Sequence, residues 1–427
     1  MRVPQVFHIE DLEGFKSRAV KWASQFQHAV CLDSNGHRQA YSSFDFLVAA
    51  DATEVHTSDH RDAFEKLKNF TDGDGDWCFG FLGYDLKNGL EDLHTRHGGT
   101  VIFPDLQFFR PRRLMILRGH SLELLYPESE EATAIADLET ILNSADPDLM
   151  TSKLKVKSVL SASEYCQSVL EMQRRIALGD IYEANFCMEF TAYGKLDPVS
   201  AYLSLNAISQ APFAAFLKTD GKFLLCASPE RYLRKEGDQL VSQPIKGTAA
   251  RSNDKKIDGD NADSLSRDPK ERSENIMIVD LVRNDLSRTA AQGSVRVEEL
   301  CAVHTFKQVH QLISTIGSRL GANHSGIDAL RTTFPMGSMT GAPKISAMQI
   351  IDALEQTRRG IYSGAVGYFT PDGDFDFNVV IRSIVYDDEA QIVSFHVGSA
   401  ITHLSIPARE FDECIVKAAA MIRVLGG

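Results

Sequence analysis

Hydrophobic residues recur at helical spacing in some stretches of the chain and gather into short runs in others. Near the N-terminus Leu12, Phe15, Ala19, Trp22 and Phe26 share one face and predict a helix over 11–26. Further helices are predicted over 132–142, 161–178, 198–208, from about 269 onward, and over 345–356. Strands are predicted over 79–85, 113–117, 181–190, 214–218, 223–227, 360–369 and 376–382, with Asp220-Gly221 as a hairpin turn.

The composition of the chain changes at one place, which indicates a single boundary between two parts. The 427 residues leave room for about two to four domains. Residues 127–157 are rich in acidic side chains and contain Asp146-Pro147-Asp148, which is typical of a surface connection. We therefore predict an N-terminal α+β segment over 1–150 and a second unit over 151–427.

Charge and cysteine content exclude several classes of protein. With 43% hydrophobic and 24% charged residues the chain has the composition of a globular protein. A net charge of -13 argues against a nucleic-acid or anionic-membrane partner. No apolar run approaches the roughly 20 residues of a membrane helix, and residues 1–6 lack a signal-peptide core. The seven cysteines form no Cys-x-x-Cys pair, which predicts reduced thiols in the cytoplasm.

Lys246 is the most distinctive candidate for chemistry. It lies in residues 242–248 (Ser-Gln-Pro-Ile-Lys-Gly-Thr), directly after a strand-like run. Pro244 and Gly247 bracket it, so we expect a tight turn at a strand end. Burial lowers the pKa of a lysine and makes it a nucleophile. The alternative is a solvated loop lysine.

Two pairs of glutamates stand at helical i, i+3 spacing. Glu271 and Glu274 share the face of a helix that continues into an apolar stripe. Glu410 and Glu413 repeat the spacing near the C-terminus, with Lys417 one turn beyond. The alternatives are favourable helix-dipole charges and a surface Glu413–Lys417 pair. Two such pairs would suit Mg2+, which takes oxygen ligands and bridges to anionic substrates.

Three further segments have features of anion binding. Residues 334–344 combine glycines and hydroxyls at the start of a helix, without the Gly-Lys-Ser/Thr of a nucleotide-binding loop. Arg382 ends a predicted strand and is suited to a carboxylate; residues 397–400 can offer backbone N–H groups. The alternatives are a structural turn and a surface salt bridge. The polar residues 251–268 are predicted to form a loop over this region.

The motifs together resemble the chorismate-utilising enzymes. Residues 228–231, 244–248, 274–285, 334–344, 362–369 and the Glu-x-x-Glu-x-x-x-Lys ending at Lys417 match in order. The resemblance is dense over 155–427 and looser before it. It implies an α+β fold in which two antiparallel β-sheets pack face to face between helices, a four-layer α/β/β/α core like that of anthranilate synthase component I. The N-terminal segment is expected to share this core, and 151–427 to be the chorismate-binding catalytic domain.

Within that family the sequence is most similar to component I of the aminodeoxychorismate synthases, because Lys246 stands where anthranilate synthases carry alanine. The resemblance implies Mg2+-dependent amination of chorismate at C4, giving 4-amino-4-deoxychorismate for para-aminobenzoate and folate synthesis. Lys246 would attack C2 in its neutral form, and Glu230 would protonate the departing 4-hydroxyl group. The metal ligands implied are Glu274 and Glu413, with Glu271 and Glu410 close by. The implied substrate-binding residues are Ser338, Thr340, Gly341, Tyr362, Arg382, Gly398, Ser399 and Lys417.

Two positions depart from the family pattern. Gln311 replaces a histidine that the family links to pyruvate elimination, which fits amination without elimination. Glu183 stands where aminating members usually have glutamine and water-adding members lysine. Its role does not follow from the sequence, and it needs a partner if buried.

The ammonia source and two alternative functions remain open. The sequence has no Gly-x-Cys-x-Gly nucleophile elbow, so we expect a separate glutamine amidotransferase subunit as partner. The first alternative is an anthranilate synthase component I, which Lys246 and Gln311 disfavour. The second is a silent chorismate-binding subunit, which would not require a nucleophile.

Overall fold

The computed structural model describes residues 2–37, 41–73, 75–150, 152–306 and 309–426. Its strands pair antiparallel in one connected sheet, and two long strands divide it into two arms. These are β3 (Phe46–Ser58) and β5 (Leu106–Arg118), which pair with each other along their length. Their register shifts between Ala52 and Glu54, next to Asp51 at φ 60°. A bulge of this kind bends a sheet, so each strand serves both arms.

The first arm runs from the N-terminal strand to the middle of the chain. Its order is β1 (Arg2–His8), β6 (Ser121–Pro127), β5, β3, β2 (His28–Asp33), β9 (Phe213–Thr219), β10 (Lys222–Ser228), β19 (Ser383–Asp387), β20 (Ile392–Ile401) and β8 (Glu183–Tyr193). The short strands β7 (Lys157–Ser158) and β16 (Gly341–Ala342) pair with β8.

The second arm continues from β5 in the other direction. Its order is β4 (Cys78–Leu82), β17 (Ala365–Phe369), β18 (Phe375–Asn378), β11 (Arg231–Glu236), β12 (Gln239–Gln243) and β15 (Val309–Arg319). Both β13 (Ile245–Ala250) and β14 (Arg296–Thr305) pair with β15. Strands from residues 1–150 thus pair with strands from the rest of the chain in both arms.

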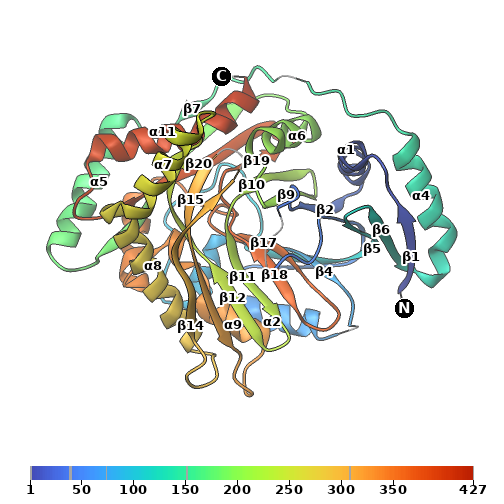
Figure 1. Ribbon diagram of the computed structural model, residues 1–427, viewed down its shortest axis with the longest axis horizontal. Helices are drawn as coiled ribbons and strands as arrows, with labels where there is room; N and C mark the ends of the chain where they lie inside the picture. Colours follow the sequence, from blue (N-terminus) through green and yellow to red (C-terminus); the bar gives the residue numbers. More distant parts are fainter. Residues whose placement is uncertain (1, 38–40, 74, 151, 307–308, 427) are drawn as a thin grey trace.

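Helices cover the outer face of each arm. The first arm packs on α1 (Leu12–Ala23), α4 (Glu131–Asn143), α5 (Ala162–Ala177), α6 (Pro198–Ser209), α10 (Lys344–Leu354) and α11 (Pro407–Leu425). The second packs on α2 (Ala63–Thr71), α8 (Pro269–Ser287) and α9 (Gly326–Thr333). A third apolar cluster, with Leu47, Phe79, Leu224 and Val366 among its members, lies between the arms. In Figure 1, α6 and α11 lie above the strands, and α2 and α9 lie in the lower half of the molecule. The predicted four-layer α+β fold is confirmed.

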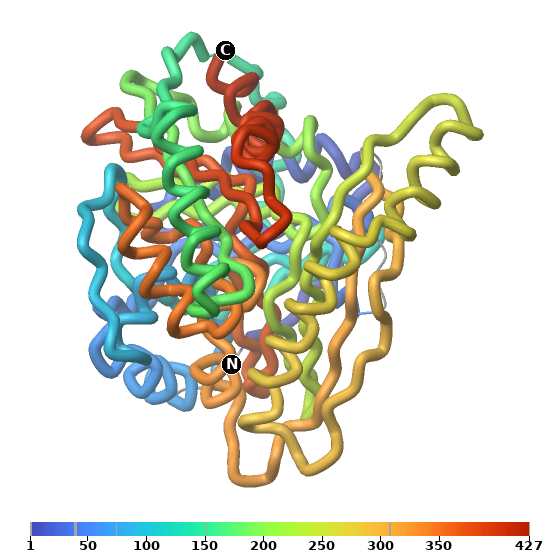
Figure 2. The backbone as a smooth tube through the Cα atoms, turned by 90° about the vertical axis from the view of Figure 1, so that its left-hand side faces the viewer, coloured from blue at the N-terminus to red at the C-terminus, as the bar shows by residue number. Residues whose placement is uncertain are grey.

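Three local predictions were wrong. The polar segment 251–268 forms a helix, α7 (Lys255–Arg267), instead of a loop. Asp254 caps it through the N–H groups of Lys256 and Ile257, and Leu265 is its buried residue. A helix held by polar contacts has no apolar stripe to reveal it. In Figure 2 this segment projects at the upper right.

The other two errors concern Lys246 and Arg382. Lys246 lies inside β13, not in a turn after a strand, and Gly247 at φ 83° forms a bulge there. Strand β18 ends at Asn378, so Arg382 follows it in an irregular segment, with φ 50°. Among the described residues no helix is both long enough and apolar enough to cross a bilayer.

Candidate active site

Lys246 reaches from β13 to β8 in the other arm. Its Nζ lies 3.2 Å from Oε1 of Glu183, and only 12% of the lysine side chain and 1% of the glutamate side chain are exposed. Glu183 therefore has the partner that its burial demands. The contact joins the two arms of the sheet at the residue expected to be the nucleophile.

The charge around Lys246 differs from the sequence-based expectation. Burial alone would lower the pKa of Lys246, but the carboxylates of Glu183, Glu274 and Glu230 outweigh it and raise the pKa. The lysine is therefore an ammonium in the substrate-free protein, and the predicted lowered pKa was wrong for this state. A nucleophilic Lys246 must first lose its proton to a neighbour.

Replacing Glu183 by glutamine tests this charge coupling. We expect Glu183→Gln to lower the pKa of Lys246, since it removes the closest of the charges that raise it. The measurement is the pH dependence of amine acylation at Lys246 in chelator-treated protein, followed by peptide mass spectrometry. Glu189→Gln is the matched control, because Glu189 is a buried glutamate of the same strand whose carboxylate accepts a hydrogen bond from Ser394. An unchanged labelling profile in Glu183→Gln would contradict the coupling.

Glu230 lies beside Lys246 at the turn between β10 and β11. It is buried, its carbonyl accepts from Val379 N–H at 3.0 Å, and its own N–H donates to the Ser228 hydroxyl at 3.2 Å. Burial raises the pKa of its carboxyl group to about 7, although Ser338, Lys246, the Ile245 backbone and Arg382 act to lower it. A carboxyl group with this pKa carries a proton near neutrality, as a general acid must.

Arg382 places a guanidinium near the Glu230 carboxyl group. This guanidinium makes no hydrogen bond or ion pair in the described part of the chain, although the side chain is half-buried. Burial lowers its pKa, and the nearby Glu230 opposes the shift. A half-buried guanidinium without a hydrogen bond or ion pair is suited to a ligand carboxylate.

We expect Arg382→Ala to raise the KM for a carboxylate substrate at least about tenfold, with a smaller effect on kcat, because a charge-assisted contact to the substrate is lost. Arg382→Lys should recover part of the loss, since lysine keeps the charge without the planar fork. Arg283→Ala is the control, because Arg283 pairs with Asp280 on the exposed surface of α8. Unchanged steady-state kinetics in Arg382→Ala would remove Arg382 from the substrate site.

The predicted metal ligands divide into two pairs with different surroundings. Glu274 and Glu410 are buried, and the ammonium of Lys270 lies 3.7 Å from Glu274 Oε1 and 3.2 Å from Glu410 Oε1. Burial raises the pKa of Glu274 to about 7. Glu413 instead binds the Lys417 ammonium at 2.7 Å. Glu271 packs against Gly247, and burial raises its pKa.

These carboxylates fit a hard cation in donor type and charge. Glu274 Oε1 and Glu410 Oε2 are buried without a hydrogen-bond partner, and oxygen donors are what Mg2+ takes. Across the described residues, however, no group of three or more acidic, histidine or cysteine side chains is arranged to hold a metal ion. The magnesium site stays a prediction, with Glu274 and Glu410 as its best-placed ligands.

The glycine-rich segment contributes more to structure than the sequence indicated. The Ser338 hydroxyl lies near enough to Glu230 to act against the rise in the pKa of its carboxyl group, which places Ser338 at the site. Thr340 donates its hydroxyl to the carbonyls of Met336 and Gly337, and so closes a turn. Gly341 pairs with Ala184 on β8, where a Cβ would lie 2.2 Å from the Glu183 carbonyl. Glycine is thus required for β16 to approach β8 next to Glu183.

The remaining predicted substrate residues line β20 and its surroundings. Lys417 donates to the Gly398 carbonyl at 2.9 Å, so these two lie together. The Ser399 hydroxyl forms a hydrogen bond with the Tyr165 hydroxyl of α5 at 2.8 Å. Tyr362 is buried, stacks on His396 with ring centroids 5.1 Å apart, and accepts from Cys187 Sγ. Their contact with substrate stays a prediction.

Two residues at the site were missed or unexplained. Glu183 had no assigned role, and Lys270 was not considered. Lys270 stands four residues before Glu274, a spacing at which side chains on a helix meet. That spacing was visible in the sequence. The contact with Glu410, 140 residues away, was not.

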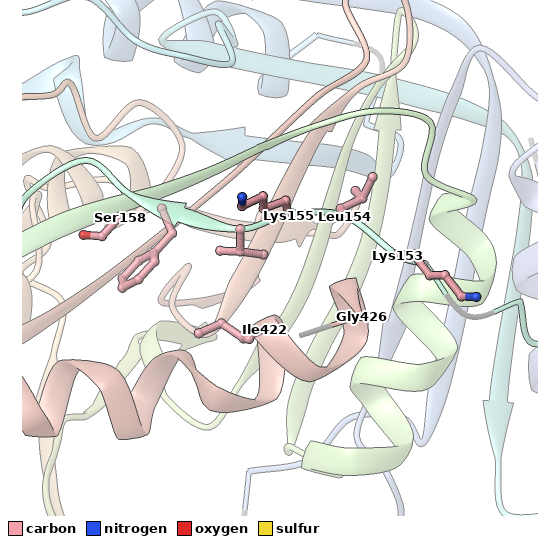
Figure 3. A pocket seen from close by; sticks show the side chains of 8 residues that line it. Lys153, Leu154, Lys155, Ser158, Ile422 and Gly426 are labelled. Carbon is pink, nitrogen blue, oxygen red and sulfur yellow. The ribbon is translucent and has the colours of Figure 1, made fainter.

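A separate cavity of about 600 Å3 lies away from this site. Its lining includes Leu154, Lys155, Phe190 and Ile422, at the far end of α11 (Figure 3). Ile422 is about 18 Å along the helix from Glu410. None of the predicted site residues lines this cavity.

One family model matches most of the chain. The family model of the chorismate binding enzyme matches residues 17–423, which include Lys246, Glu230, Arg382 and both glutamate pairs. The chain belongs to the chorismate-binding enzyme family. The family match spans both the N-terminal segment and the rest of the chain, in keeping with the strand pairing between them.

Individual relatives of this chorismate-binding enzyme have related names. It is 42% identical over 350 residues to aminodeoxychorismate synthase component 1 of Salmonella typhimurium, with 82% of this chain and 76% of the relative covered. It is 40% identical over 367 residues to aminodeoxychorismate synthase of Streptomyces pristinaespiralis, with 81% of this chain covered but only 50% of the relative. The chain thus spans half the length of that Streptomyces protein. The crystal structure of anthranilate synthase component I from Streptococcus pneumoniae superposes with a TM-score of 0.80 at 26% identity, covering 90% of this chain and 93% of that one.

Proposed function

We propose that the protein is an aminodeoxychorismate synthase, which converts chorismate and ammonia to 4-amino-4-deoxychorismate through a covalent intermediate on Lys246. The observation that carries the proposal is the buried contact between Lys246 and Glu183 beside Glu230, whose pKa is about 7. A lysine, a base and an acid are what the displacement of a hydroxyl group by an amine requires. The product would feed para-aminobenzoate and folate synthesis.

Arg382 would bind the enolpyruvyl carboxylate of chorismate, because its half-buried guanidinium makes no hydrogen bond or ion pair in the described chain. Tyr362 and the backbone at Gly398 would complete this end of the site. Glu274 and Glu410, with Glu271 and Glu413 near them, would hold Mg2+. When bound, the ion supplies positive charge for the ring carboxylate.

The reaction begins with a proton transfer. Glu183 accepts a proton from Lys246, whose amine then forms a bond to C2 of the ring. Both ring double bonds shift by one position, the C4–O bond breaks, and Glu230 donates its proton so that the hydroxyl group leaves as water. Ammonia then forms a bond to C4, both double bonds shift back, and the C2–N bond breaks, so that Lys246 leaves as a neutral amine. The new ammonium group at C4 gives a proton to Glu230, and Glu183 returns its proton to Lys246. Chorismate plus ammonia thus gives aminodeoxychorismate plus water, with no oxidant or reductant.

The ammonia source is proposed to be a glutamine amidotransferase subunit. The Salmonella relative is named a component 1, which indicates an enzyme of more than one component. The Streptomyces relative is named simply as aminodeoxychorismate synthase, and its chain is twice as long as the segment that matches this protein. Free ammonium at high concentration should replace the partner in vitro.

Two structural features favour this function over anthranilate synthesis. Lys246 is present and buried at the site. Gln311, at the position linked to pyruvate elimination, is 1% exposed, and its Oε1 lacks a hydrogen-bond partner. An amide cannot act as the proton shuttle that a histidine provides. The product should therefore retain its enolpyruvyl group.

Product analysis tests the proposal. The chain is incubated with chorismate, Mg2+ and ammonium at mildly alkaline pH, and products are followed by mass spectrometry and pyruvate release. Aminodeoxychorismate without pyruvate is the expected result. Anthranilate with pyruvate would contradict it. Absence of turnover, persisting after an amidotransferase subunit is added, would support a silent chorismate-binding protein.

A further inference from the structure

Lys270 occupies the space between two buried carboxylates that come from different helices. Its ammonium lies 3.2 Å from Glu410 Oε1 on α11 and 3.7 Å from Glu274 Oε1 on α8. The two glutamate side chains are only 3% and 7% exposed. Two buried carboxylates facing each other repel and lose hydration, so they require a positive charge between them. Lys270 supplies that charge.

The contact of Lys270 with the two glutamates differs from a fully buried ion pair. The Lys270 side chain is 37% exposed, so its stem leads from solvent into the site. Glu410 Oε2 remains buried and without a hydrogen-bond partner. The backbone at Lys270 is fixed by a hydrogen bond from its N–H to Asp268 Oδ1 at 2.9 Å. The side chain can thus withdraw to water while helix α8 stays in place.

We propose that Lys270 is a built-in competitor for the divalent cation, a lysine ammonium that keeps Glu274 and Glu410 together and is displaced when the ion binds. The inference rests on the proposed magnesium site and adds a regulation of that site. A divalent ion held by Glu274 and Glu410 would bring two positive charges to the oxygens that the ammonium contacts, and would therefore displace it. When the cation binds, Lys270 must therefore lose its contacts with Glu274 and Glu410.

The direction in which a substitution of Lys270 changes the affinity for the cation distinguishes a competing lysine from one that positions the glutamates. If Lys270 competes with the ion, a protein with a neutral side chain of similar length at position 270 should bind the ion more tightly. If Lys270 positions the glutamates for the ion, the same change should weaken binding. Lys270→Met keeps the length of the side chain and removes the charge, and Lys270→Arg keeps the charge.

The experiment measures cation binding directly and does not depend on turnover. Chelator-treated protein without chorismate is titrated with Mn2+ by electron paramagnetic resonance and with Mg2+ by calorimetry. We expect Lys270→Met to tighten the Kd by about tenfold, since an ion pair to a charged group no longer has to be broken. Lys256→Met is the matched control, because Lys256 is an exposed lysine on α7 whose loss changes the net charge equally.

A second measurement uses the unaltered chain, in case the variant folds poorly. Amine-reactive labelling of Lys270, quantified by peptide mass spectrometry, should increase when Mg2+ is added, because the ammonium moves into solvent. Weaker or unchanged binding in Lys270→Met, or labelling of Lys270 that falls with Mg2+, would overturn the inference. So would the absence of cation binding in both forms, a result that leaves the product analysis of C4 amination untouched.

Discussion

Lys246→Ala is expected to lower the rate of C4 amination by more than about a thousandfold, which is the order of loss when an enzyme's nucleophile is removed. The physical reason is that the amine forms the bond to C2 that displaces the hydroxyl group. Steady-state formation of aminodeoxychorismate, with saturating chorismate and ammonium, measures the change. Turnover close to that of the unaltered protein would exclude Lys246 as the nucleophile.

A control is required because Lys246 also neutralises a buried carboxylate. Removing one partner of a buried ion pair destabilises a protein by roughly 3–5 kcal/mol. Glu183 is 1% exposed, so Lys246→Ala leaves it without its cation. The double variant Lys246→Met with Glu183→Gln removes both charges and should regain most of the free energy of unfolding. It should remain inactive, which separates lost chemistry from lost folding.

Glu230→Gln is expected to lower kcat by about a hundredfold to ten-thousandfold, the range for loss of a general acid. Hydroxide is a poor leaving group, and an amide cannot donate a proton to it. Glutamine has nearly the shape of a protonated glutamic acid, so the fold should be retained. Circular dichroism and thermal unfolding provide the control, and unaltered kcat would exclude Glu230 as the acid.

The pH dependence of kcat should report the protonation state of Glu230. Burial raises the pKa of Glu230 to about 7, so the carboxyl group is protonated below that pH and ionised above it. The acid form is the active one, and kcat should therefore fall as the pH rises through about 7. This limb of the profile should disappear in Glu230→Gln. Protonated Glu230 also favours the folded state, so its contribution to stability is present below pH 4.5 and is lost as the pH rises through 7.

Local sequence signals predicted much of the fold because they describe local geometry. Ser161 and Glu164 predicted the start of α5, and both form the reciprocal hydrogen bonds of a capping box. Gly179 ends that helix at φ 84°. Asp220 and Gly221 both have positive φ, as the predicted hairpin between β9 and β10 requires. The resemblance of ordered motifs then predicted how these elements pack.

The site was only partly predictable because its contacts join distant parts of the chain. The pairing of Lys246 with Glu183 depends on β13 and β8 meeting across the two arms. Because these strands are far apart in the sequence, neither the partner of Glu183 nor the raised pKa of Lys246 could be predicted from it. The contact of Lys270 with Glu410 could not be predicted for the same reason, since the two residues are 140 positions apart in the sequence. Asp258 shows a related limit, because its bonds to Arg251 and His310 hold α7 without any apolar pattern.

The most direct test of the covalent mechanism is the intact mass of the protein after mixing with chorismate and Mg2+ in the absence of ammonia. The mechanism predicts a species heavier by one chorismate less one water, with the added mass on the peptide that contains Lys246. The species should disappear when ammonium is added and should be absent from Lys246→Ala. Formation of aminodeoxychorismate without any such species in rapid-quench samples, or an adduct on another residue, would contradict it.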